Sequence, residues 1–311
     1  MTEIETKNGD ILVYGLAANE TVRCMAAITT NTIAEAATRH KTSATATAAL
    51  GRTMTGALLL GASLKELDRL TVQIIGDGPI GGISAESNAK GEVRGYVRNP
   101  NAESPFNEKG KLDVRGIVGN GMFYVMREAG FEIGFRPEPY QGSVPIVSGE
   151  IAEDFAYYLT TSEQIPSGVL LGVHVRGDKD SGGMIVTAAG GVMIQMMPGA
   201  DEKTIGEIEH AITNTTQSVT DMIHNGASAE YLIRAALGTI EFSILEKRNV
   251  RFTCQCSHER AVSMVGALDT AEIQSMLSED KGAVITCHFC NETYIIDEAM
   301  LGKVFRERSS I

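Results

Sequence analysis

Four of the five cysteines in this 311-residue chain occur as two closely spaced pairs near its C-terminal end. Cys254 and Cys256 form a Cys-x-Cys pair, and a Cys-x-x-Cys pair, Cys287 and Cys290, begins thirty-one positions later. Each pair follows a short β-like run and precedes polar turn residues. Two chelating pairs supply the four sulfur ligands of a tetrahedral zinc site. The spacing therefore predicts one Zn²⁺ per chain, held by all four thiolates.

Other uses of the four cysteines explain the pattern less well. A secreted disulfide framework would need an export signal, but residues 1–10 are polar and acidic. Four reduced thiols that pack as small hydrophobes would have no reason to occur in pairs. A thioredoxin-like redox motif uses one Cys-x-x-Cys in a βαβ pattern and does not need a second pair. Because four thiolates complete the site, His258 and His288 are interpreted as its neighbours and not as ligands.

The Cys-x-Cys spacing also suggests a redox switch. Residues i and i+2 of an extended segment lie about 6.5–7 Å apart at Cα. Disulfides prefer roughly 4.4–6.8 Å, so a Cys254–Cys256 bridge would close a small strained ring. Strained bridges are the labile, regulatory ones. The thiolates would hold zinc when reduced and expel it when they pair on oxidation.

Composition and charge exclude several classes of protein. The chain is 43% hydrophobic and 21% charged, which is typical of a soluble globular protein. Its net charge is −12, and residues 251–311 carry six Lys or Arg against nine Asp or Glu, so we expect no nucleic-acid partner. No apolar run reaches the ~18 residues of a membrane span, so we expect no membrane partner. We expect a cytoplasmic protein whose thiols are reduced at rest.

Hydrophobic periodicity predicts an α+β fold, with a mixed α/β core domain over residues 1–200. A long Ala-rich helix is expected over 45–67 and a shorter helix over 149–163, and Cys24 is expected to be a buried core thiol. A small zinc domain is expected at 251–311, after a linker at 201–250. Strands are predicted at 11–14, 22–26, 70–75, 93–97, 114–118, 122–126, 169–175, 184–188 and 192–197.

Residues 201–250 are predicted to form an all-helical linker that begins at the capping residue Asp201. Its apolar side chains recur at helical spacing, so another surface must cover them or they are exposed. A zinc domain with little core of its own depends on its metal, and we expect the docking of the linker to depend on that domain. The apolar positions expected to be masked at rest are Ile205, Ile208, Ile212, Met222 and Ile223.

Six further motifs precede the cysteines: AALGRTM at 48–54, GPIG at 78–81, NAKGEVR at 88–94, LDVR at 112–115, VSGE at 147–150 and AAGG at 188–191. Each motif alone is short and weakly specific. In this order, and with the cysteine spacing, they span essentially the whole chain. The chain resembles the redox-regulated 33 kDa heat-shock chaperones, the heat shock protein 33 or 33 kDa chaperonin family.

The resemblance implies an ATP-independent holdase and no enzyme. In that family the reduced, zinc-bound protein is inactive. Peroxide with heat, or hypochlorous acid, drives disulfide formation, zinc release, unfolding of the zinc domain and linker, and homodimerisation. The resemblance makes Cys254, Cys256, Cys287 and Cys290 the zinc ligands and implies Cys254–Cys256 and Cys287–Cys290 bridges, with Cys24 outside the set. It implies unfolded client proteins as partners, and the masked linker positions become candidates for binding them.

Two other functions are kept as alternatives. A zinc-ribbon regulatory or nucleic-acid-binding protein would need positive surface, and this chain lacks the charge for it. A thiol oxidoreductase would turn over dithiol substrates. A zinc hydrolase is disfavoured because a site with four cysteine ligands leaves no open coordination position.

Overall fold

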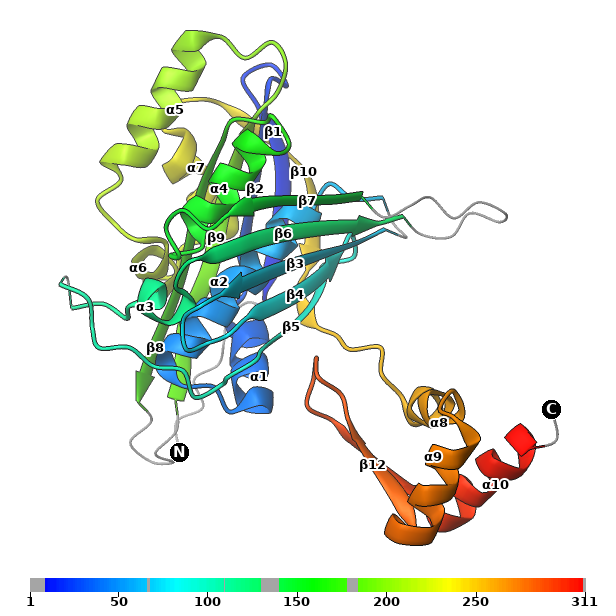
Figure 1. Cartoon of the computed structure of the whole chain (residues 1–311). Helices are drawn as coiled ribbons and strands as arrows, with labels where there is room; N and C mark the ends of the chain where they lie inside the picture. The colour runs from blue at the N-terminus through cyan, green and yellow to red at the C-terminus, as the bar shows by residue number, and fades with distance from the viewer. Residues whose placement is uncertain (1–8, 66–67, 109, 130–139, 178–183, 310–311) are drawn as a thin grey trace. The chain divides into compact units, whose positions relative to one another are not determined.

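The computed structural model describes residues 9–65, 68–108, 110–129, 140–177 and 184–309 of the chain. The chain divides into two compact units, Met1–Thr253 and Cys254–Ile311 (Figure 1). The α+β fold class expected from the sequence is confirmed, since helices and several sheets are both present. Within the described ranges, no helix has both the length and the apolar character needed to cross a membrane.

A five-stranded antiparallel sheet of order β10-β1-β2-β9-β8 forms one layer of the larger unit. Residues 18–21 form the turn of its first hairpin, between the strands predicted at 11–14 and 22–26. The two strands predicted at 184–188 and 192–197 are one continuous strand, because Gly190 and Gly191 stay in the ladder with β2. The strands are β1 (Ile11–Ala17), β2 (Val22–Ile28), β8 (Ser167–Gly177), β9 (Met184–Met196) and β10 (Phe242–Asn249).

The second layer is a six-stranded sheet of order β11-β5-β4-β3-β6-β7. Its strands pair antiparallel except for the two-residue edge strand β11, which lies parallel to β5. Strand β4 was not predicted, because its sequence ISAESN has one large apolar residue and is otherwise small or polar. The strands are β3 (Arg69–Gly76), β4 (Ile83–Asn88), β5 (Glu92–Val97), β6 (Gly121–Glu128), β7 (Tyr140–Pro145) and β11 (Arg251–Phe252).

The predicted Ala-rich helix is α2 (Ala44–Gly61), which contacts strands of both sheets (Figure 1). Ser43 caps it by accepting a hydrogen bond from the Ala46 N–H at 3.2 Å. Many of its residues are small, and almost all are buried because both sides of the helix are covered. A Cβ atom at Gly56 would lie 2.3 Å from the Phe155 ring, so the packing requires glycine there. The helix ends at Gly61, earlier than the predicted residue 67.

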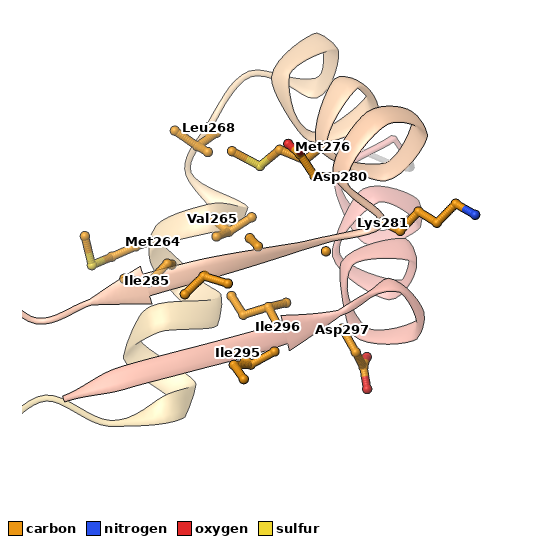
Figure 2. Close-up of a pocket in the computed structure, with 13 residues that line it drawn as sticks. Met264, Val265, Leu268, Met276, Asp280, Lys281, Ile285, Ile295, Ile296 and Asp297 are labelled. Atoms are coloured by element: carbon orange, nitrogen blue, oxygen red, sulfur yellow. The ribbon is translucent and has the colours of Figure 1, made fainter.

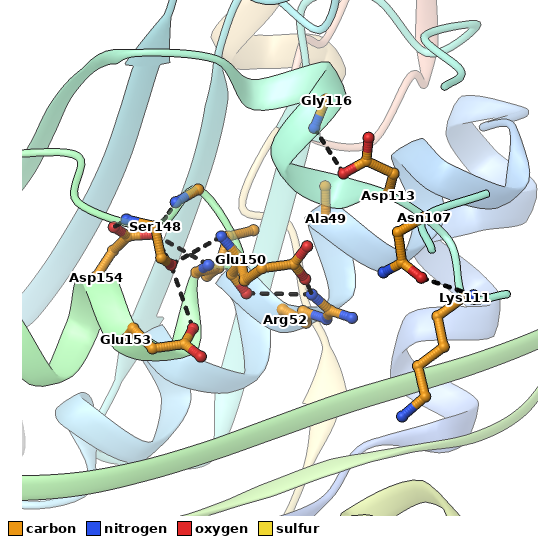
Figure 3. Close-up of polar contacts among 12 residues, drawn as sticks. Ala49, Arg52, Asn107, Lys111, Asp113, Gly116, Ser148, Glu150, Glu153 and Asp154 are labelled. Carbon is orange, nitrogen blue, oxygen red and sulfur yellow. Dashed lines mark hydrogen bonds and ion pairs between the residues drawn. The ribbon is translucent and has the colours of Figure 1, made fainter. Parts of the chain in front are cut away.

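Shorter helices complete this unit, with α1 (Thr30–His40) before α2 and α4 (Ala152–Thr161) after β7. The strand predicted at 114–118 is wrong, since these residues form helix α3 (Val114–Val118). Asp113 caps α3 by accepting from the Gly116 N–H at 3.0 Å, and the buried positions are spaced as on one helical face. At the start of α4 the buried carboxylate of Asp154 accepts backbone hydrogen bonds from the preceding loop, including one from Ser148 (Figure 3).

Residues 201–237 form the helices α5 (Glu202–Asn214), α6 (Val219–His224) and α7 (Ala229–Leu237). They cover the face of the five-stranded sheet opposite α2. A Cβ atom at Gly190 would meet Ile223 of α6, whereas one at the next residue, Gly191, would come within 3.3 Å of Leu59 of α2. Because successive residues of a strand point to opposite faces, β9 is buried between two helical layers.

The prediction that residues 201–250 are all helical is wrong for their last part. Residues 242–249 form β10, an edge strand that pairs with β1 along its whole length. Phe242 and Ile244 alternate with more exposed residues and pack on the core, whereas Leu245 is 59% exposed. This period of two is the pattern of a half-buried strand. The predicted linker therefore packs within the same compact unit as residues 1–200.

The smaller unit contains α8 (His258–Gly266), α9 (Thr270–Ser275), a π-helical turn (Met276–Asp280) and α10 (Glu298–Ser309). A two-stranded antiparallel sheet, β12 (Gly282–Thr286) and β13 (Thr293–Asp297), lies beside these helices. Its buried core is small and comprises Val265, Ile273, Ile296, Leu301 and Val304. A core of this size gives a unit of about sixty residues little stability of its own.

Candidate metal centre

The turn between β12 and β13 presents two of the cysteines. The Cys287 N–H donates to the carbonyl of Glu292 at 2.8 Å, and the Asn291 N–H donates to the carbonyl of Cys287 at 2.8 Å. Asn291 has a φ of 60°, in the left-handed region that asparagine tolerates better than most residues. This tight turn brings the sulfurs of Cys287 and Cys290 into one group of possible metal ligands.

The other two cysteines lie between β11 and α8. Ser257 caps α8 by accepting from the Arg260 N–H at 3.2 Å. The Arg260 guanidinium reaches back and donates to the carbonyl of Gln255 at 2.7 Å, between Cys254 and Cys256. The first turn of α8 thus fixes the backbone of the Cys-x-Cys segment.

The four cysteine sulfurs form one cluster, in which all ligand atoms lie within 4.8 Å of one another. The Sγ atoms of Cys254 and Cys287 are 3.7 Å apart, and those of Cys256 and Cys290 are 3.2 Å apart. In a tetrahedral site with Zn–S bonds of ~2.3 Å, neighbouring sulfurs are about 3.8 Å apart. The group can therefore hold a metal ion of this size, with all four ligands supplied by the smaller unit.

The protonation of the cluster depends on whether a cation is bound. Burial raises the pKa of the Cys290 thiol, which is 3% exposed, and burial also raises the pKa of Cys256. Without a cation, these sulfurs therefore keep their protons at neutral pH. A bound divalent ion reverses this preference, because thiolates are its ligands and their protons are released on binding.

Tyr294, which the sequence analysis did not identify, is the residue of β13 that reaches this cluster. Its hydroxyl donates a hydrogen bond to the sulfur of Cys256 at 3.1 Å. This bond to sulfur is the main reason why the pKa of the Tyr294 phenol is raised. Only the strand register shows the contact, since Tyr294 lies four residues after the last cysteine and thirty-eight after Cys256.

The two histidines near the cysteines lie outside the group of metal-ligating atoms found among the described residues. The His258 ring packs edge-on against Tyr294, with ring centroids 6.3 Å apart, and its Nε2 lies 3.2 Å from the carbonyl of Ile295. His288 occupies the turn between two of the cysteines. The arrangement agrees with the interpretation of both as neighbours of the site.

The smaller unit also carries an apolar groove of about 680 Å³ along the β12–β13 sheet (Figure 2). Val265 of α8, Ile285 of β12 and Ile296 of β13 line it. Val284 and Ile295 face each other across the two strands and are 69% and 70% exposed. Much of the apolar surface of this unit is therefore not buried in its own core.

The five apolar linker positions lie in the larger unit. Ile208 and Met222, which are 1% and 4% exposed, belong to a hydrophobic cluster of the larger unit. Ile212 and Ile223 pack against this hydrophobic cluster, and Ile205 is half-buried. The surface that covers this cluster is the five-stranded sheet, through residues of β1, β2 and β9. Cys24 of β2 lies in it, and burial raises the pKa of its thiol to about 12. The expectation that Cys24 is a buried core thiol is confirmed.

Comparisons with known proteins agree over nearly the whole chain. The model of the Hsp33 protein family matches residues 10–297. The 33 kDa chaperonins of Staphylococcus aureus strains JH9 and Newman are 47% identical over 293 residues, covering 94% of this chain and 96% of theirs. The crystal structure of the 33 kDa chaperonin (heat shock protein 33 homolog) from Thermotoga maritima is 34% identical, with a TM-score of 0.88, and the match covers 98% of this chain and 100% of that one. The chain belongs to the Hsp33 protein family.

Proposed function

We propose that this protein is a cytoplasmic, redox-regulated chaperone that holds unfolding proteins without hydrolysing ATP. Reduced and zinc-bound, it is inactive; oxidation of the four cysteines releases zinc and activates it. The observation that carries the proposal is the cluster of four sulfurs within 4.8 Å in a unit with little core of its own. A closed site of four cysteines leaves no position for a substrate, which favours a regulatory role over an enzymatic one.

Zinc is the structural support of the smaller unit in this proposal. One Zn²⁺ per chain binds Cys254, Cys256, Cys287 and Cys290. Structural zinc contributes about 10–16 kcal/mol in small zinc-binding peptides, and a whole domain is stable by only about 5–15 kcal/mol. Residues 254–311 therefore lose their fold when they lose the metal.

Peroxide acts on the thiolates in two steps. A thiolate sulfur attacks one peroxide oxygen, the O–O bond breaks, and a sulfenic acid forms with loss of hydroxide. A second thiolate then attacks this sulfur, an S–S bond forms and the S–O bond breaks. The hydroxide that leaves takes a proton from the medium and becomes water. We propose the pairs Cys254–Cys256 and Cys287–Cys290. The sulfur contacts of 3.7 and 3.2 Å in the folded cluster run between the pairs. The proposed bridges therefore form as the cluster opens, when short loops close most easily.

The path from the cluster to the linker runs through two edge strands. Strand β11 ends two residues before Cys254. It is held to β5 by the Thr253 N–H, which donates to the carbonyl of Val93 at 3.1 Å, and by an Arg251–Glu92 ion pair of 2.6 Å. Strand β10 precedes it and covers the edge of β1. When residues 254–311 unfold, these edges fray, and the linker helices lose part of their support.

The surface that is uncovered would bind clients. Ile205, Ile208, Ile212, Met222 and Ile223 are proposed as client-binding residues, because a cluster that is buried at rest becomes a contiguous apolar patch when the linker opens. The oxidised protein is proposed to be a homodimer. Nucleic acid is not proposed as a partner, since residues 251–311 carry more acidic than basic side chains.

Suppression of the aggregation of a denatured test protein measures this function. The reduced, zinc-loaded protein should not suppress aggregation, whereas protein treated with peroxide at elevated temperature should, with loss of one zinc per chain. Peptide mapping of the oxidised sample should find the two bridges within the pairs. Cys24→Ala is the matched control and should behave as the wild type, because Cys24 is buried in the larger unit and is not one of the four clustered cysteines. Equal suppression by reduced and oxidised protein would refute the redox regulation.

A further inference from the structure

The hydroxyl of Tyr294 is a hydrogen-bond donor to a sulfur of the candidate metal centre, at 3.1 Å from Cys256 Sγ. Tyr294 lies on β13 opposite Ile285 of β12, so the strand register fixes where its ring stands. The His258 ring packs edge-on against it and limits its movement. The donor is therefore held toward Cys256 by two separate contacts, one from the sheet and one from α8.

We propose that Tyr294 sets the rate at which the centre responds to oxidant, by withdrawing electron density from the Cys256 sulfur. A hydrogen bond to a thiolate lowers the electron density that the sulfur offers to an electrophile. Donors around a metal ligand also orient it, and their loss typically weakens metal binding about 10–100-fold. Tyr294 thus acts through Cys256 as a positioning residue that holds the reduced state against premature oxidation.

This inference rests on the proposed function, since it assumes that the four cysteines bind zinc and that peroxide oxidises them. It adds a side chain outside the cysteine set and gives it a direction of effect. Removing the hydroxyl should make the Cys256 sulfur more reactive toward peroxide. It should also make the metal easier to lose, so both changes lead to faster release of zinc.

Tyr294→Phe removes the hydroxyl and keeps the ring that packs on His258. Zinc release after addition of hydrogen peroxide, followed with a colorimetric chelator, should be about threefold faster than in the wild type for each tenfold gain in the basicity of the sulfur, because thiol nucleophilicity follows basicity with a coefficient of ~0.4–0.5. In competition with a chelator, the variant should bind zinc about tenfold more weakly. Circular dichroism of the zinc-loaded variant checks that it is folded.

Thr293→Val is the matched control. It removes a hydroxyl from the neighbouring residue of the same strand. The Thr293 hydroxyl contacts the Thr286 hydroxyl across the two strands at 3.1 Å and does not bond to a sulfur. This variant should release zinc at the wild-type rate. A loss of strand stability alone would affect both variants, whereas loss of the bond to sulfur affects only Tyr294→Phe.

Cobalt provides a readout that a merely structural role would not change. With Co²⁺ in place of zinc, the sulfur-to-cobalt charge-transfer absorption should move to longer wavelength in Tyr294→Phe, because a sulfur without its donor gives up electrons more easily. It should not move in Thr293→Val. An unchanged absorption band and an unchanged release rate in Tyr294→Phe would overturn the inference. If the wild type itself bound no zinc or kept it in peroxide, the proposed function would fail instead.

Discussion

Single residues of the centre differ in how far the sequence reveals them. The four cysteines are apparent from their spacing, because chelating pairs require short separations within a turn. The turn that holds Cys290 is also readable, since the asparagine after it tolerates the left-handed backbone found there. The contact of Tyr294 with Cys256 cannot be predicted from the sequence, because it depends on the register of two strands and on where α8 begins.

Replacing Cys287 and Cys290 together by serine tests the metal assignment at this scale. The double variant should bind no zinc at micromolar concentrations, because two of four thiolate ligands are gone and serine is a poor zinc ligand. Residues 254–311 should then lose their amide protection, while the sheets of the larger unit keep theirs. Zinc content and hydrogen exchange measure the two effects, with Cys24→Ala as the control. Zinc retained at normal affinity would show that other residues bind it.

At the scale of elements, the sequence predicted most helices and strands of the larger unit but misassigned those whose context overrides the local pattern. Residues 114–118 include the β-branched Val114, Ile117 and Val118, yet the Asp113 cap and a buried helical face make the segment α3. Residues 242–249 follow three helices and look like their continuation. They form β10 because the open edge of β1 offers a full ladder of backbone partners.

The anchor of β11 gives a second prediction. The hydrogen bond from Arg251 holds the pKa of Glu92 below its usual value of 4.5. A lowered pKa means that the ion pair stabilises the fold above that value and that this contribution is lost as the pH falls through the folded-state pKa. In Glu92→Gln, trypsin should cleave after Arg251 faster at neutral pH, because β11 is held less firmly. In the wild-type protein, the protection of the Thr253 amide, measured relative to the exchange rate of a free amide at the same pH, should fall as the pH drops through the pKa of Glu92.

Glu207→Gln is the control for this prediction. Glu207 forms an exposed ion pair with Lys203 on α5 and does not touch β11, so the rate of cleavage after Arg251 should not change. If Glu92→Gln also left this rate unchanged, the ion pair would not be what holds the strand.

At the scale of the whole molecule, the sequence predicted the α+β class and the family, and the structure and the comparisons confirm both. Periodicity shows that the linker helices have an apolar face, but not which surface covers it. That surface is the five-stranded sheet, with Val13, Cys24 and Ile194 among its contacts. The linker is thus held by the larger unit, and in the proposed mechanism the smaller unit acts on it through the chain at β10 and β11.

Hydrogen exchange measured by mass spectrometry before and after peroxide treatment at elevated temperature tests the coupling most directly. We predict that residues 254–311 lose protection together with zinc, and that the segments 202–237 and 242–249 lose protection as aggregation suppression appears. Strands β3 and β6, which lie inside the six-stranded sheet, should stay protected. Suppression of aggregation with unchanged protection of 202–249 would contradict the claim that oxidation of the cysteine centre activates the chaperone by uncovering its linker.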